Sequence, residues 1–124
     1  MLNIFKSHHP VRHAKSFKYA FEGIFHALIN EPNFRIQVIV VSIATAGGIV
    51  FKIANVEWAI LTISMGLLLA AEMINTVVEE VVDAYVKDYQ EVAKIVKDLA
   101  AGFVLITAIV AALVLFFVFS PFFK

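Results

Sequence analysis

The chain has 124 residues, of which 61% are hydrophobic and 16% are charged, and its ten basic residues balance its ten acidic ones. Average soluble domains hold about 45–50% apolar and about 25% charged residues, so this composition excludes an ordinary soluble domain. The absence of cysteine excludes disulfides and thiolate metal sites, and a formal net charge of zero argues against a nucleic-acid partner. With a mean hydropathy of +0.88, the chain is predicted to be a small integral membrane protein with one domain, residues 1–124.

The first predicted element is an amphipathic helix over about residues 15–29. Its large apolar side chains recur at helical spacing along one stripe: Phe17, Phe21, Ile24, Phe25 and Leu28. Its polar side chains fall on the other side: Lys15, Lys18, Glu22 and His26. Such a helix is expected to lie on the membrane surface. The histidines near it, His8, His9 and His13, are interpreted as a mobile surface tract, not as a metal site.

Three uncharged or nearly uncharged stretches follow, at about 32–51, 58–78 and 99–120. A helix needs about 20 mostly apolar residues to cross the hydrocarbon core of a bilayer, so each stretch is long enough to span. Pro32 suits the first turn of a helix, where its missing N–H would have no intrahelical partner. The predicted fold class is therefore an all-α membrane protein with three transmembrane helices and an N-terminal amphipathic surface helix.

The lysines and arginines are distributed unequally across these spans. Eight of the ten lie before or at the start of the first span or between the second and third spans, whereas Lys52 and Lys124 lie on the opposite side. By the positive-inside rule, the N-terminus and residues 79–98 are expected to face the cytoplasm.

The second span contains an unexpected carboxylate, Glu72. An ionisable group at that depth costs a few kcal/mol or more, which makes it a candidate functional residue. At about 100° per residue, Glu72 shares one helical face with Asn75, Glu79 and Asp83, and this face extends about 16 Å. The alternatives are a structural hydrogen bond between helices for Glu72 and a solvated helix end for Glu79 and Asp83.

Further polar residues lie at the other cytoplasmic junctions. Lys94, Lys97 and Asp98 can share one face at the start of the third span, and Glu31 lies where the surface helix meets the first span. The alternatives are a membrane anchor for Lys94 and a helix-start carboxylate for Glu31. Together the three junctions are expected to bring carboxylates and amines to one membrane surface.

These residue types favour phosphoryl transfer. Carboxylates with an asparagine suit Mg²⁺, which takes few protein oxygens plus phosphates and waters, and nearby lysines can neutralise phosphoryl charge. A buried carboxylate is a candidate base for deprotonating an alcohol. The sequence has neither a Walker motif nor a kinase glycine loop, so a kinase here would be unrelated to the soluble kinases.

The stretch from Glu72 to Asp83, EMINTVVEEVVD, resembles the signature of the bacterial integral-membrane diacylglycerol kinase and undecaprenol kinase family. Asn30-Glu31 followed by Phe34-Arg35, and Tyr89 followed by Lys97-Asp98, are similar to the family's other motifs. The resemblance implies a homotrimer in the bacterial inner membrane, with active sites composed between subunits on the cytoplasmic side.

The resemblance also implies an ATP-dependent lipid kinase that uses Mg²⁺. Glu72 would be the catalytic base, and Glu31 and Glu79 would bind the metal. The nucleotide-binding residues would be Tyr19, Asn75, Asp83, Lys97 and Asp98. The lipid substrate stays open between diacylglycerol, which would give phosphatidic acid, and undecaprenol, which would give undecaprenyl phosphate. The competing hypothesis is a small membrane transporter or regulatory subunit that uses Glu72 as an intramembrane carboxylate.

Overall fold

The structure is a computed structural model that describes the backbone of residues 10–124 and the side chains from Lys15 onward. It contains four α-helices and one short 3₁₀ helix: α1 (Pro10–Asn30), α2 (Pro32–Phe51), α3 (Asn55–Tyr85), α4 (Glu91–Phe119) and η2 (Ser120–Phe123). The described part of the chain has no strand, which confirms the all-helical prediction. His8, His9 and the side chain of His13 lie outside the described residues, so their predicted role is not addressed by the structure.

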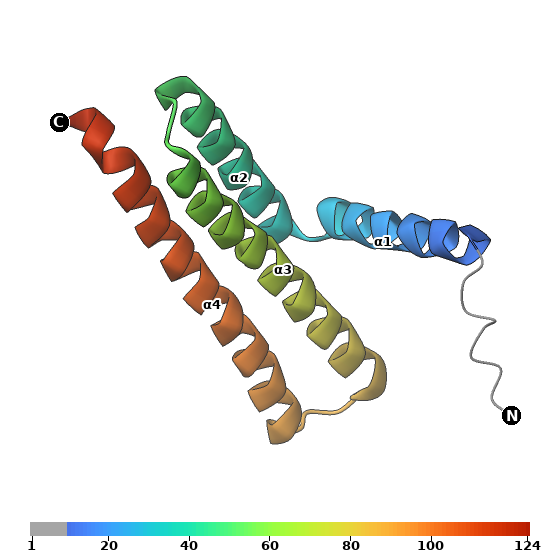
Figure 1. Ribbon diagram of the computed structural model, residues 1–124. Coiled ribbons are helices and arrows are strands. Elements are labelled where there is room, and N and C mark those ends of the chain that lie inside the picture. The colour runs from blue at the N-terminus through green and yellow to red at the C-terminus, as the bar shows by residue number, and fades with distance from the viewer. Residues whose placement is uncertain (1–9) are drawn as a thin grey trace, which may run out of the picture.

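Helices α2, α3 and α4 run side by side, whereas α1 leads away from them (Figure 1). All three of the bundled helices are long and apolar enough to cross a membrane, as the sequence predicts. Buried residues make up 44% of the apolar stretch of α3 but only 17% of those of α2 and α4. Helix α3 is therefore the centre of the bundle, packed against α2 and, over a longer distance, against α4.

A tight reversal joins α2 to α3. Helix α2 ends at Phe51 and is capped by Lys52, whose left-handed backbone (φ 53°, ψ 50°) lets its N–H bond to the carbonyls of the last turn. Helix α3 then begins at Asn55. In its first turn, the Glu57 carboxylate accepts a hydrogen bond of 2.7 Å from the N–H of Ala54, the residue before the helix. Gly48 allows Trp58 to pack closely, because a Cβ at this position would lie 2.7 Å from the Trp58 ring.

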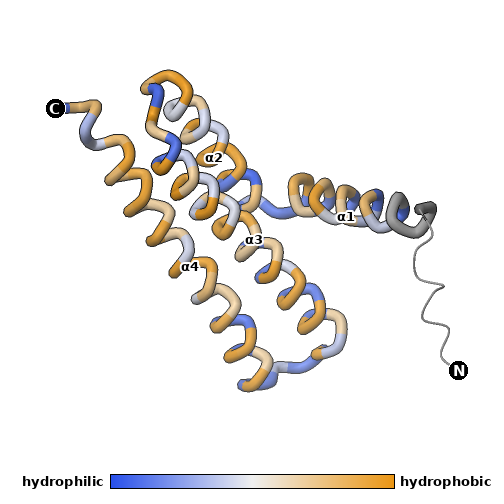
Figure 2. The backbone as a smooth tube through the Cα atoms, viewed as in Figure 1, coloured by the Kyte–Doolittle hydropathy of each residue, from blue (hydrophilic) through white to orange (hydrophobic). Residues whose placement is uncertain are grey.

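The buried apolar core is small and lies between the three bundled helices: Ala44, Ile53, Leu61, Met65, Leu68, Ala111 and Val118. Most other large apolar side chains are exposed. Hydrophobic residues recur along the length of the bundled helices (Figure 2). Such a surface suits lipid tails, since apolar patches of this extent are rare on soluble monomers.

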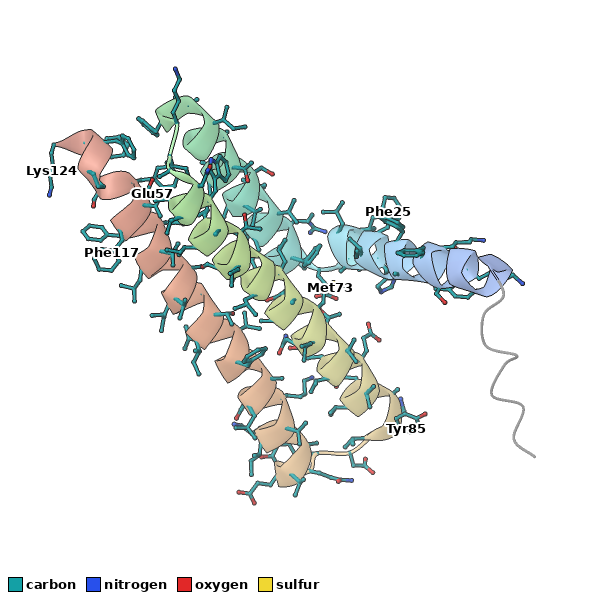
Figure 3. All side chains as sticks on the ribbon, in the orientation of Figure 1. Phe25, Glu57, Met73, Tyr85, Phe117 and Lys124 are labelled. Atoms are coloured by element: carbon teal, nitrogen blue, oxygen red, sulfur yellow. The ribbon has the colours of Figure 1, made fainter. Side chains whose placement is uncertain are left out.

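Helix α3 is longer than a bilayer requires. Its 31 residues correspond to about 46 Å, against about 30 Å of hydrocarbon. Glu57 and Tyr85 mark its two ends in Figure 3. Because the apolar stretch ends near Val78, the last turns of α3 are expected to extend beyond the membrane core, and so are the first turns of α4. The location of α1 on the membrane surface stays a prediction.

Candidate functional site

The deepest polar group of the site is Glu72, which is only 2% exposed. Its carboxylate oxygen Oε2 accepts a hydrogen bond of 2.8 Å from the Nε2 amide of Gln37 on α2. A charged group in such a setting needs a donor, because burying an unpaired charge costs several kcal/mol. The packing of α2 on α3 therefore supplies a partner to a carboxylate inside the bundle.

One turn further along α3, Asn75 continues the same face. Its side chain is 8% exposed and donates a hydrogen bond of 3.0 Å from Nδ2 to Oε1 of Glu79. The other amide atom, Oδ1, is buried and has no hydrogen-bond partner among the described residues. Buried polar atoms in native proteins are normally paired, so the unpaired Asn75 Oδ1 is an acceptor that a bound ligand could satisfy.

The outer end of the site is an open cavity of about 430 Å³ between the last turns of α3 and the first turns of α4. Three of the predicted nucleotide-binding residues line it: Asp83, Lys97 and Asp98. Lys87, Tyr89 and Gln90, from the segment that connects the two helices, line it as well. Polar residues are concentrated at this end of α3 and α4 (Figure 2). The structure thus brings together residues that are up to 15 positions apart in the chain, Asp83 to Asp98.

Ion pairs organise this cavity. The Lys97 ammonium lies 3.0 and 3.2 Å from the two carboxylate oxygens of Asp83, and Lys94 forms an ion pair with Asp98. Lys97 precedes the apolar stretch that begins at Leu99. The hydrogen bond to Asp83 raises the pKa of Lys97 above its ordinary value. Burial opposes this rise in part, and the charges of Asp83 and Glu79 add to it. Lys97 therefore stays protonated at neutral and moderately alkaline pH.

Two predicted site residues, Glu31 and Tyr19, belong neither to the polar face of α3 nor to the lining of this cavity. Glu31 is the residue before the first turn of α2, at the α1–α2 junction, which lies beside α3 (Figure 1). Tyr19 is 64% exposed on α1, and the cavity is lined by residues of α3, α4 and their connection, not by Tyr19. A single chain therefore assembles Glu72, Asn75 and Glu79 on one face of α3 and Asp83, Lys97 and Asp98 around the cavity, and leaves Tyr19 apart.

The donor set fits a hard divalent cation. Among the residues that the structure describes, no group of three or more histidine, cysteine or acidic side chains surrounds a common point. Mg²⁺ does not need such a cage, because it is usually bound by one or two carboxylates together with substrate phosphates and waters. The unpaired Asn75 Oδ1 beside Glu79 is an oxygen ligand of the kind that Mg²⁺ accepts.

The sequence-based reasoning missed the role of Gln37. In the sequence this residue is one of three uncharged polar interruptions of the first span, with Ser42 and Thr45. The hydroxyls of Ser42 and Thr45 bond to carbonyls of their own helix, both at 2.8 Å, whereas Gln37 reaches another helix. The glutamine side chain is long enough to reach beyond its own helix, and this length was the available signal.

Comparisons with known proteins identify the family. The family model described as prokaryotic diacylglycerol kinase matches residues 18–119. The chain is similar to a diacylglycerol kinase of Synechocystis sp., with 41% identity over 80% of this chain and 57% of that protein. It is also similar to the undecaprenol kinase of Bacillus subtilis, with 29% identity over 89% of each chain.

A diacylglycerol kinase of Escherichia coli K12 shares 30% identity over 80% of this chain and 81% of its own length. The match thus spans little more than half of the Synechocystis protein but most of the other two. All three relatives are named as lipid kinases. The family model covers most of the described residues, including every predicted site residue. The chain belongs to the prokaryotic diacylglycerol kinase family, a family of lipid kinases.

Proposed function

We propose that the protein is an ATP-dependent lipid kinase that transfers the γ-phosphate of Mg-ATP to the hydroxyl of a membrane lipid alcohol. The observation that carries the proposal is the continuous polar face of α3. This face starts at the buried Glu72 carboxylate and leads out to a cavity lined by Asp83 and Lys97. It connects the depth at which a lipid hydroxyl lies with the surface at which a soluble nucleotide arrives.

Glu72 serves as the general base. Its carboxylate takes the proton of the lipid hydroxyl, and the hydroxyl oxygen forms a bond to the γ-phosphorus. The bond from that phosphorus to the β,γ-bridging oxygen breaks, and ADP leaves with the electron pair. Phosphoryl transfer needs little covalent chemistry from the protein, so positioning and charge stabilisation account for most of the catalysis.

Glu31 and Glu79 would hold Mg²⁺, and Asn75 Oδ1 is an additional oxygen near Glu79. Bound in this position, Mg²⁺ would neutralise charge on the nucleotide phosphates. The contact from Asn75 Nδ2 orients Glu79, in the way that hydrogen bonds from neighbouring residues orient metal ligands.

The cavity between α3 and α4 binds the nucleotide. Lys97 and Asn75 contact the phosphates, while Asp83, Asp98 and Tyr19 shape the rest of the site. The ion pair with Asp83 holds the Lys97 ammonium at the cavity before ATP arrives. An ordered lysine loses less side-chain entropy when it binds a phosphate than a freely rotating one.

The proposal includes a homotrimer with sites shared between subunits, in the inner membrane of a bacterium and with the site on the cytoplasmic side. It is supported by the separation of Tyr19 from the cavity within one chain and by the excess of lysine and arginine at the cytoplasmic ends of the spans.

The test is a transfer assay. Purified protein in detergent micelles is given Mg-ATP labelled at the γ-phosphate and either diacylglycerol or undecaprenol, and labelled lipid is extracted. We expect phosphatidic acid or undecaprenyl phosphate, and the ratio of kcat/KM for the two alcohols identifies the preferred substrate. Transfer to neither alcohol would contradict the proposal and favour the transporter or regulatory alternative.

A further inference from the structure

A side-chain contact between α2 and α3 has no place in the mechanism above. Gln37 lies on α2, half-buried, and donates from Nε2 to Glu72 Oε2 at 2.8 Å. Met73, labelled in Figure 3, marks the level of this contact along α3. Because an ionised carboxylate can only accept, the amide must present its nitrogen to Glu72. The contact is an oriented hydrogen bond to a charged group, which is stronger than one between neutral groups.

We infer that Gln37 is a positioning residue for the transfer reaction, acting through Glu72. By engaging Oε2, the amide fixes the rotation of the carboxylate and leaves Oε1 to accept the proton of the lipid hydroxyl. This inference rests on the proposed function of Glu72 as the base. It adds a residue from α2 to a catalytic face that is otherwise built on α3.

The second amide atom supports this role. Gln37 Oε1 is buried and has no hydrogen-bond partner among the described residues. The bond to Glu72 is therefore the one side-chain hydrogen bond that this amide makes among the described residues. When Glu72 has taken the substrate proton on Oε1, its Oε2 is still an acceptor, so the hydrogen bond from Gln37 Nε2 persists.

Glutamine can therefore pair with Glu72 both before and after proton transfer. A lysine or arginine in its place has donors only, so it would favour the ionised carboxylate and oppose the protonated one. An aliphatic residue would leave both forms without a partner. The neutral amide suits a base that must accept a proton and release it again in every turnover.

The primary test is Gln37→Met, which keeps an unbranched side chain of similar length and removes both amide atoms. We expect kcat to fall about 10- to 100-fold, the order expected when a reacting group loses its orientation. The KM values for Mg-ATP and for the lipid alcohol are expected to stay within about twofold, because neither substrate contacts the amide. The control is Thr45→Val on the same helix, whose hydroxyl bonds only to Val41 O, and its kcat is expected to match that of the wild type.

A double-mutant comparison separates positioning from general damage. In a Glu72→Gln background, Gln37→Met is expected to change the residual rate less than twofold, because the group that it positions is no longer a base. If the double variant instead shows the product of the two single-variant losses in kcat, the inference is contradicted. Helix content by circular dichroism is recorded for each variant. If Gln37→Met does not fold, Gln37→Asn, which is one methylene too short to keep the bond, is measured instead.

The outcomes are distinguishable from a failure of the proposed function. A wild-type protein with no transfer activity would remove the kinase proposal itself. An active wild type whose folded Gln37 variants keep full kcat would overturn the positioning role. An unchanged kcat with a raised KM for the lipid would also overturn it, since that result assigns Gln37 to substrate binding.

Discussion

The inner and outer halves of the polar face on α3 are built in different ways. In the inner half, Glu72 and Asn75 are almost fully buried, and each makes one short hydrogen bond to a side chain. In the outer half, Asp83 and Lys97 form an ion pair in which the two side chains are 67% and 36% exposed. The same helix thus carries a site that is nearly closed at one end and open to water at the other.

This difference predicts that substitutions in the inner half and in the outer half of the polar face will have different effects on activity. A hydrogen bond to a buried charge has no solvent to replace it, so its loss leaves a costly unpaired group. An exposed ion pair contributes little and is screened by salt. We therefore expect changes in the inner half to affect the chemical step strongly and changes in the outer half to tune nucleotide binding.

The largest effect is expected from Glu72→Gln, which keeps the shape of the side chain and removes the base. We expect kcat to fall about 10²- to 10⁴-fold, the usual contribution of general base catalysis. Mg-ATP affinity, measured by equilibrium binding, is expected to stay within about twofold. The matched control is Glu80→Gln, an exposed carboxylate of the same helix that lies off the polar face. Full turnover by Glu72→Gln would remove Glu72 from the mechanism.

Glu79→Gln is expected to weaken binding of Mg-ATP by about 10- to 100-fold, because it replaces a charged metal ligand with a neutral amide. Nucleotide binding without Mg²⁺ is expected to change little, and raising the Mg²⁺ concentration is expected to recover part of the loss. The measurement is a titration of ATP at several Mg²⁺ concentrations. An affinity that is unchanged at every concentration would exclude Glu79 as a ligand.

Much of this site could be predicted from the sequence because its residues lie close together on regular helices. The spacing of Glu72, Asn75, Glu79 and Asp83 fixes a common face once the helix is known, and α3 is indeed one helix over this range. The three membrane-spanning helices could be predicted equally well, since a long apolar stretch is a strong signal.

Contacts between helices could not be predicted from the sequence in the same way. The bond from Gln37 to Glu72 joins residues 35 positions apart and depends on how α2 rotates and slides against α3. The pairing of Lys97 with Asp83 depends in turn on the connection between α3 and α4. Hydrophobic periodicity does not determine helix rotation to the precision of one side chain, so these partners came only from the structure.

The inner half can also be disturbed from a distance. Gly48→Ala would place a Cβ 2.7 Å from the Trp58 ring and 3.1 Å from Ile53, and would force α2 away from α3 near their turn. Overpacking of this kind costs about 1–3 kcal/mol. We expect a lower thermal midpoint and a partial loss of kcat through the Gln37 contact. Gly66→Ala, where a Cβ has open space inside α3, is the control for loss of glycine. It should leave kcat unchanged and should not lower the thermal midpoint, because alanine is the better helix former.

The smallest effect is expected at the exposed end, from Asp83→Asn. The substitution removes the carboxylate that pairs with Lys97 but keeps a side chain of the same size. We expect Mg-ATP affinity to change only about two- to fivefold at neutral pH, because exposed pairs are weak. The change should shrink further as salt is raised.

The pH dependence gives a sharper signature of Asp83→Asn. The bond to Asp83 raises the pKa of Lys97, so the wild-type ammonium keeps its proton to higher pH than it would alone. In the variant the pKa falls back toward its ordinary value, and the loss of Mg-ATP affinity on raising the pH should begin at a lower pH. Binding curves measured at several alkaline pH values compare the two proteins. Coinciding pH profiles would show that the lysine charge acts on the nucleotide independently of Asp83. A loss as large as that of Glu79→Gln would contradict the small effect predicted here, because an exposed ion pair would then matter as much as a metal ligand.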